Sequence, residues 1–206
     1  MITHTGKFHS LLFPSLVWRM PSEKIFLTFD DGPHETATPI VLDVLRQEDM
    51  KATFFLTGKN IPGRESIVAR IAEEGHAIGV HSYFHKRSSA FSKETTKKEI
   101  EDTLTLLSQI TTIPIRLFRP PFGFFSMNTI KAARELGMYL IMWSCLTGDF
   151  RNWSTSKIVN TALHKLHGGS IQVFHDNDLT QSKIGDVLPQ TIAAIRSRGF
   201  EFGAIR

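Results

Sequence analysis

The sequence predicts a single α/β domain, built as a distorted, mostly parallel (β/α) barrel of about seven strands. Short apolar runs typical of buried strands alternate along the 206 residues with segments of helical periodicity, a pattern typical of parallel sheets covered by helices. No glycine-rich dinucleotide motif or P-loop follows a strand, although open doubly wound sheets often carry one there. We therefore favour a closed or nearly closed barrel over an open sheet.

Composition and charge are those of an ordinary globular protein. Hydrophobic residues make up 41% of the chain and charged residues 21%, which supports a sizeable core and excludes a disordered chain. The single cysteine, Cys145, excludes an internal disulfide and a multi-cysteine zinc site, and we interpret it as a packed thiol. The net charge of +4 comes from scattered lysines and arginines without a basic stripe among aromatic residues, so we expect no nucleic-acid partner.

The N-terminal part of the chain is expected to form an arm of residues 1–20 packed on a catalytic domain of residues 21–206. The apolar run 11–18 is too short for a membrane span, contains Pro14 and is not followed by the small-residue cleavage site of a secretory signal. These features favour a cytoplasmic protein, with an envelope-associated one as the alternative. Peripheral membrane contact through residues 11–18 is a second interpretation of the arm.

The first half of the chain contains three expected strands. The alternating apolar run 25–29 ends at two acids followed by a Gly-Pro turn. Thr38-Pro39 then predicts a helix start, because threonine is a frequent N-cap and proline suits the first helical position. Buried strands are expected at 52–57 and 77–80, separated by a helix at 66–74 that ends before a glycine.

The second half continues the alternation. A helix is expected at 93–109, with Thr96-x-x-Glu99 as its capping box. Apolar runs and terminal glycines then predict strands at 115–118, 138–143, 170–174 and 200–204 and helices at 128–136, 156–166 and 186–198.

The candidate functional residues stand at the carboxyl ends of the expected strands. Asp30 and Asp31, His81, Arg119 and His175 come at the carboxyl ends of four different strands, and Asp149 lies in a loop of the same kind. In barrel enzymes the catalytic residues gather at this rim. A common rim favours a shared site over a set of unrelated loop residues.

Two acids and two histidines at this rim suggest separate roles in proton transfer and in metal binding. Asp30 and Asp31 are adjacent, and like charges this close raise one pKa unless a cation lies between them. His81 and His85 are four residues apart, so a helical turn would let both imidazoles reach one ion. Two imidazoles and one carboxylate suit zinc, and also manganese, cobalt or nickel.

Five ordered segments resemble the motifs of NodB-type polysaccharide deacetylases, family 4 of the carbohydrate esterases, over about residues 24–204. The matching segments are Thr28-Phe29-Asp30-Asp31-Gly32-Pro33, His81-Ser82-x-x-His85, Arg119-Pro120-Pro121-Phe122-Gly123, a looser fourth motif counted from Trp143, and Val173-Phe174-His175. In the fourth motif the family's acid falls on Asp149, Phe150 replaces the usual tryptophan, and Leu146 replaces a second acid. A competing register at Trp153 would place Asn152 where the acid is expected.

The resemblance implies a role for each matched residue. Asp30 would be the general base and His175 the general acid, while Arg119 would orient the base and Asp149 would keep the acid charged. The implied metal ligands are Asp31, His81 and His85. Phe122 would offer its backbone N–H to the oxyanion, and Phe122, Phe150 and Val173 would form an apolar pocket for an acetyl methyl group.

The implied reaction is hydrolysis of an N-acetyl group from an amino sugar in a glycan or glycoconjugate. The implied cofactor is one divalent ion, Zn²⁺ in the first place, with Co²⁺, Mn²⁺ and Ni²⁺ as alternatives. The sequence leaves the glycan and the oligomeric state open. Two further functions stay open: a hydrolase of cyclic amides or ureides with the same fold, and a carbohydrate-binding pseudoenzyme.

Overall fold

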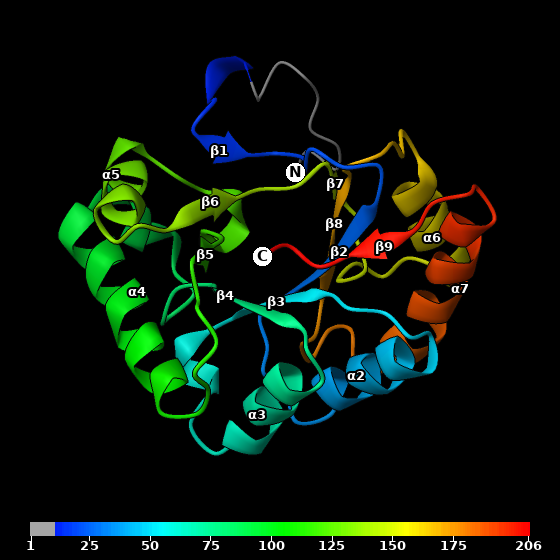
Figure 1. The fold of residues 1–206 in the computed structure, drawn as a ribbon, viewed down its shortest axis with the longest axis horizontal. Helices are drawn as coiled ribbons and strands as arrows, with labels where there is room; N and C mark the ends of the chain where they lie inside the picture. Colours follow the sequence, from blue (N-terminus) through cyan, green and yellow to red (C-terminus); the bar gives the residue numbers. More distant parts are fainter. Residues whose placement is uncertain (1–10) are drawn as a thin grey trace.

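Parallel pairing organises the strands of this protein. In the computed structural model, which describes residues 11–206, nine short strands form one sheet in the order β1-β6-β5-β4-β3-β2-β8-β7, and β9 pairs with β2. All of these strand pairs are parallel. Helices surround the strands on the outside (Figure 1). The predicted mostly parallel barrel is therefore confirmed.

The strands and helices lie close to their expected positions. The strands are β1 (Leu16–Val17), β2 (Ile25–Asp30), β3 (Thr53–Leu56), β4 (Ala77–Val80), β5 (Leu117–Phe118), β6 (Tyr139–Ile141), β7 (Cys145–Leu146), β8 (Ile171–His175) and β9 (Phe202–Gly203). The helices are α2 (Ala37–Gln47), α3 (Glu65–Glu73), α4 (Lys93–Ser108), α5 (Met127–Glu135), α6 (Thr155–Leu163) and α7 (Ile184–Arg196), with 3-10 turns η1 (Gly58–Asn60), η2 (Arg87–Phe91) and η3 (Pro121–Gly123). Strands β1 and β7 were not predicted, because β1 lies in the apolar run interpreted as an arm and β7 follows shortly after the end of β6.

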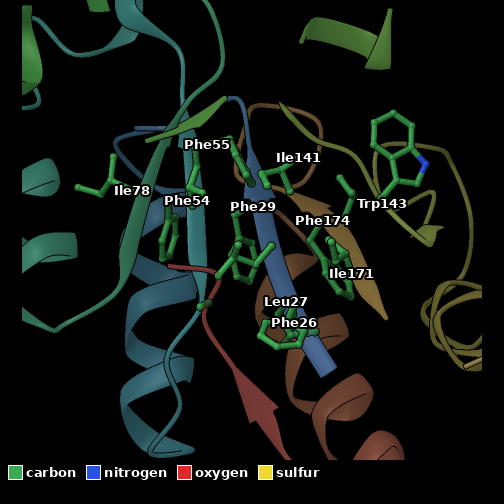
Figure 2. Packing of buried hydrophobic residues seen from close by; sticks show 14 of the residues in the cluster. Phe26, Leu27, Phe29, Phe54, Phe55, Ile78, Ile141, Trp143, Ile171 and Phe174 are labelled. Atoms are coloured by element: carbon green, nitrogen blue, oxygen red, sulfur yellow. The ribbon is translucent and has the colours of Figure 1, made fainter. Parts of the chain in front are cut away.

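The core is aromatic along the central strands. Phe29 on β2 stacks on Phe54 of β3 with ring centroids 5.1 Å apart, and Phe174 of β8 lies 6.0 Å from Phe29 on the other side (Figure 2). All three side chains are fully buried. Burial of large aromatic surface is among the strongest contributions to a core, so the ends of these three strands are rigid platforms.

The barrel is incomplete where the chain enters it. The edge strands β1 and β7 do not pair with each other, and a single antiparallel bridge from Arg19 to Ser170 spans the gap. Leu16 and Trp18 in the arm are buried. A membrane contact through residues 11–18 would therefore have to do without these two side chains, and residues 1–10 of the expected arm lie outside the described part of the chain.

The capping box expected in α4 is wrong. Ser92 caps this helix, and its hydroxyl accepts the Thr95 N–H at 3.1 Å. Thr96 and Glu99 are buried instead. Glu99 accepts hydrogen bonds from two backbone N–H groups of the loop after β4, at 3.1 and 3.2 Å. Glu99, which resembled part of a helix-start motif, thus makes a tertiary contact to a loop of the candidate site.

Cys145 is buried and its thiol donates to the Thr161 carbonyl at 3.5 Å, and burial raises the pKa of this thiol to about 12. Such a thiol packs and does not act as a nucleophile at neutral pH. Among the helices of residues 11–206, none combines the length and apolar character of a membrane span.

Candidate active site at the carboxyl ends of the strands

A cavity of about 300 Å³ opens at the carboxyl ends of the strands. Its lining includes Asp30, Asp31, His81, His85 and His175, which are five of the predicted site residues. The strand register explains their meeting, because Asp30 at the end of β2 pairs with His175 at the end of β8. The predicted rim therefore exists and is hollow.

Asp30 is held by a buried arginine. Nη1 of Arg119 donates to Oδ1 of Asp30 at 2.6 Å and to the Thr28 hydroxyl at 2.8 Å. Nε and Nη2 of Arg119 donate to the carbonyls of Ile141 and Met142 at 3.2 and 3.0 Å. Arg119 has no solvent-exposed surface, so its charge is matched by the Asp30 carboxylate. This network fixes one carboxylate oxygen and leaves Oδ2 to face the cavity.

Asp31, His81 and His85 form a compact cluster with a different chemistry. One ligand atom from each lies within 4.8 Å of the other two. Oδ1 of Asp31 is 3.1 Å from Nε2 of His85 and 3.7 Å from Nε2 of His81. Nδ1 of His81 donates to the Arg119 carbonyl at 2.7 Å, so its Nε2 presents a lone pair to the cluster.

The two histidines converge without a helical turn. Ser82 and His85 both have positive φ, 61° and 57°, and the His85 N–H donates to the Ser82 hydroxyl at 3.0 Å. The expected helical spacing is therefore wrong in its geometry. Hydrogen bonds from this loop to the buried Glu99 help to hold the unusual backbone.

Two asparagines that sequence reasoning missed hold Asp31. Nδ2 of Asn177 donates to Oδ2 of Asp31 at 2.6 Å, and Nδ2 of Asn60 donates to the Asp31 carbonyl at 2.7 Å. The Leu179 N–H donates to Oδ1 of Asn177 at 2.9 Å, which fixes the orientation of the Asn177 amide. Asn177 thus occupies one oxygen of Asp31 and directs the other toward the histidines. Its signal in the sequence was only its position two residues after His175.

These residues fit a divalent cation. Oδ1 of Asp31 is buried and makes no hydrogen bond with good geometry to any described residue. Burial alone would raise the pKa of Asp31, but the nearby histidines outweigh burial and hold this pKa below its usual range. Burial lowers the pKa of His81. An ionised carboxylate and an imidazole that tends to stay neutral are the protonation states that a metal requires, and the donor set suits zinc or a similar ion.

His175 is held by the predicted acid, Asp149. Nδ1 of His175 donates to Oδ1 of Asp149 at 2.8 Å, and the His175 N–H donates to Oδ2 at 2.6 Å. Burial would lower the pKa of His175, but the Asp149 charge and hydrogen bond outweigh burial and raise it to about 9. Asp149 is fully buried whereas Asn152 is exposed, so the register that places the acid at Asp149 matches the geometry.

A second buried acid, Asp176, follows His175 and was not predicted. It accepts the Gly32 N–H at 3.1 Å and the Thr38 hydroxyl at 2.5 Å. A Cβ on Gly32 would lie 2.4 Å from Oδ2 of Asp176, so only glycine fits there. Thr38 was expected to cap α2, but Thr36 occupies the N-cap position. Burial raises the pKa of Asp176 to about 8, and this carboxyl joins the turn after β2 to the end of β8.

Aromatic side chains form the cavity walls. The Phe122 ring lies 4.5 Å from the His85 ring, and the Phe150 ring lies 5.0 Å from the His175 ring, centroid to centroid. Both line the cavity, as does Leu146. Val173, predicted as a third pocket residue, does not line this cavity, because it precedes His175 by two residues and lies one layer deeper on the same strand face.

Fold and site together define a class: a (β/α)-barrel protein with an Asp–Arg pair, an Asp–His pair and an Asp-His-His cluster that could hold a metal ion on its carboxyl rim. Residues 19–141 match the polysaccharide deacetylase family. A peptidoglycan-N-acetylglucosamine deacetylase from Bacillus cereus is 34% identical over 181 residues, which are 87% of this chain and 66% of that protein.

Two solved structures are similar over most of the chain. The Bc1960 peptidoglycan N-acetylglucosamine deacetylase has a TM-score of 0.89 and 31% identity, and the match covers 95% of this chain and 94% of that one. BA3943 from Bacillus anthracis, described as a CE4 family pseudoenzyme, has a TM-score of 0.84 and 25% identity and covers 93% of this chain and 68% of that one.

This chain belongs to the polysaccharide deacetylase family. The predicted resemblance and fold are confirmed, and the enzyme class is confirmed at the level of the family. The chain spans about two thirds of the length of the Bacillus cereus relative. One similar structure is a pseudoenzyme. Membership of the family therefore does not by itself establish activity, which depends on the residues in the site of this chain.

Proposed function

We propose that this protein is a metal-dependent hydrolase that removes N-acetyl groups from amino-sugar residues of a glycan. The observation that carries the proposal is the different environment of two adjacent carboxylates. Asp30 is bound by Arg119 at 2.6 Å, whereas Asp31 directs an oxygen without a hydrogen bond toward His81 and His85. One carboxylate is thus suited to handle a proton and the other to hold a cation.

The proposed cofactor is one divalent cation held by Asp31, His81 and His85. Zn²⁺ is our first choice, with Co²⁺, Mn²⁺ and Ni²⁺ as alternatives, because one carboxylate and two imidazoles suit these ions. When bound in such a site, an ion of this kind makes water more acidic and polarises a carbonyl oxygen. Asn177 and the Arg119 carbonyl would keep the ligand atoms in place.

Asp30 is the proposed general base. Arg119 fixes its Oδ1, and its Oδ2 lies 3.9 Å from Nε2 of His81 at the edge of the cluster. This oxygen would take the proton of the attacking water while the water oxygen bonds to the acyl carbon. Arg119 would act through Asp30 as an orienting residue, since it is buried and does not line the cavity.

His175 is the proposed general acid. Asp149 binds Nδ1, so Nε2 is the atom that can give a proton to the leaving nitrogen as the carbon–nitrogen bond breaks. The products are acetate and a free amine, and the proton taken by Asp30 replaces in the enzyme the one given by His175. The pKa of about 9 keeps His175 protonated near neutral pH.

The cavity walls support an acetyl substrate. The Phe122 ring packs against His85 and the Phe150 ring packs against His175. The two rings would therefore flank a small acyl group bound between these histidines. The backbone N–H of Phe122 is the proposed donor to the oxyanion, a type of contact that contributes several kcal/mol to catalysis. Two of the relatives described above, the Bacillus cereus protein and Bc1960, are peptidoglycan N-acetylglucosamine deacetylases, which supports an N-acetylated glycan as the substrate.

The experiment that tests this function measures acetate released from N-acetylglucosamine oligomers and from peptidoglycan, before and after metal removal and with each metal restored. We expect release that depends on the metal and is absent in Asp30→Asn. Turnover of ureido-ring substrates without acetate release would favour the cyclic amide hydrolase. Glycan binding without turnover by the metal-loaded protein would identify a pseudoenzyme.

The cellular location remains a prediction, because it depends on where the substrate glycan is found. The sequence favoured the cytoplasm, whereas relatives named as peptidoglycan deacetylases favour the envelope-associated alternative. Fractionation of cells that express the full chain, followed by assay of each fraction for acetate release, separates the two.

A further inference from the structure

Three cations meet around the loop that carries Trp153: two lie against its ring and the third binds the backbone of the same loop. Arg151 lies with its guanidinium carbon 4.8 Å from the Trp153 ring centroid, and the Lys157 ammonium lies 4.3 Å from it. The Lys183 ammonium donates to the Arg151 carbonyl at 2.6 Å. We call Arg151, Lys157 and Lys183 the basic patch. It joins the loop before α6 to α6 itself and to the start of α7, two helices that lie side by side (Figure 1).

The basic patch has no acidic partner within residues 11–206. Elsewhere many cations form ion pairs, such as Lys93 with Glu135 and Lys98 with Asp102, whereas the three patch cations form none among the described residues. The nearest acid along the loop, Asp149, is buried and engaged with His175. Three positive charges without an acidic partner in one region of the surface favour the binding of an anion there.

The basic patch is fixed beside the cavity. A Cβ on Gly148 would lie 2.5 Å from the Trp153 ring, so the indole packs directly on the backbone next to Asp149. The Arg151 guanidinium carbon is also 5.7 Å from the centroid of Phe150, which lines the cavity. Ring contacts orient Arg151 and Lys157 in advance, and the hydrogen bond to the Arg151 carbonyl orients Lys183, which reduces the entropy lost when they bind a ligand.

We propose that the basic patch binds an anionic group of the substrate glycan, a carboxylate or a phosphate, carried close to the N-acetylated sugar. The inference rests on the proposed function and adds to it a charge preference. Arginine and lysine are the usual partners of both groups. A structural role would need only Trp153 and one stacked side chain, and it would not account for three cations without an acidic partner among the described residues.

A binding experiment tests the patch without relying on turnover. The probes are neutral chitotetraose, a tetrasaccharide of N-acetylglucosamine and N-acetylmuramic acid that carries carboxylates, and chitotetraose 6-phosphate. Calorimetry compares the metal-loaded wild type with the triple variant Arg151→Gln, Lys157→Gln, Lys183→Gln. The matched control is Lys97→Gln, Lys98→Gln, Lys131→Gln on α4 and α5, which removes the same charge elsewhere.

We expect the wild type to bind at least one anionic probe about tenfold more tightly than the neutral one at low salt, with a difference that shrinks as salt is added. The patch variant should lose this difference and the control variant should keep it. The anionic probe whose affinity exceeds that of the neutral probe by the larger factor identifies the preferred group, carboxylate or phosphate.

Turnover separates this inference from the proposed function. If acetate is released and the ratio of kcat/KM for the anionic and neutral probes falls about tenfold in the patch variant, mainly through KM, both stand. Equal ratios and equal affinities in wild type and patch variant overturn the inference alone. Absence of acetate release together with retained charge-dependent binding overturns the proposed function alone. Tighter binding of a single-stranded DNA oligonucleotide than of any glycan probe would overturn the assignment of the patch to the substrate.

Discussion

The two sides of the rim are built differently. Asp30 and His175 end adjacent strands, and each is bound by a buried partner of opposite charge, Arg119 or Asp149. Asp31 and His85 lie in loops with positive φ, 82° and 57°. Their cluster contains a buried carboxylate oxygen without a hydrogen bond.

The difference indicates that the side with Asp30 and His175 has all its partners within the protein, whereas the cluster with Asp31 and His85 lacks one among the described residues. Groups that carry protons need fixed partners that set their pKa values, and the strand ends supply them. A cluster that binds a cation needs converging lone pairs with room between them, and the binding of an ion would compensate the strained backbone and the unsatisfied oxygen of this one. If proton transfer and ion binding are separate in this way, a change on one side of the rim should leave the other side intact.

The largest effect is expected from the cluster histidines. His81→Ala or His85→Ala should abolish both tight metal binding and acetate release, because the site would be left with two ligands. Elemental analysis and an acetate assay of each purified variant measure the two losses, with circular dichroism to verify folding. A folded variant that retains one metal per chain would show that the cluster is not the metal site.

A smaller effect is expected from the asparagine behind the cluster. Asn177→Ala should weaken metal binding by about 10- to 100-fold, because it removes the donor to Oδ2 of Asp31. Excess metal should restore most of the rate. Chelator competition measures the affinity, and Asn152→Ala, at an exposed asparagine, is the matched control. Equal metal affinities in the two variants would contradict the role of Asn177.

The acyl pocket should discriminate more modestly. Phe122 and Phe150 would clash with a longer acyl chain, so N-acetyl should be preferred over N-butyryl on the same sugar by about 1 to 3 kcal/mol. Values of kcat/KM for the two substrates measure this preference. Phe150→Ala should reduce it. Equal rates on both substrates in the wild type would remove the aromatic walls from the account.

The pH profile should move with Asp149. As the proposed general acid, His175 would act in its protonated form, so the catalytic rate should fall on the alkaline side as pH rises through about 9. In Asp149→Asn the raising influence is lost and burial lowers the pKa, so the alkaline limb should move to lower pH while the acid limb stays. The rate constant is measured against pH with metal saturation verified at each point. An alkaline limb that does not move would detach Asp149 from His175.

The sequence predicted the barrel and the site to a large extent, because strand ends and motif spacing are local signals. Parallel strands bring their carboxyl ends to one rim, so Asp30, His81, Arg119 and His175 could be placed together before any contact was known. The order of the strands, the missing closure between β1 and β7 and the existence of these two edge strands depend on long-range pairing that no local pattern encodes.

The residues that support the site were harder to predict. Glu99 resembled part of a capping box and Thr38 resembled an N-cap, yet both bind distant segments, because tertiary hydrogen bonds outweighed the local preference. Asn177 and Asp176 carried no motif. The basic patch escaped notice because its members are 6 and 26 residues apart along the chain and meet only where α6 and α7 pack.

The most direct test of the divided rim compares two isosteric variants. Zn²⁺ affinity and the rate of acetate release at saturating metal are measured for Asp30→Asn and Asp31→Asn beside the wild type. Asp30→Asn should keep the metal affinity and lose about two to four orders of magnitude in rate, whereas Asp31→Asn should lose metal affinity. If Asp30→Asn instead weakened Zn²⁺ binding while Asp31→Asn left it intact, the assignment of proton transfer and metal binding to the two carboxylates would be contradicted.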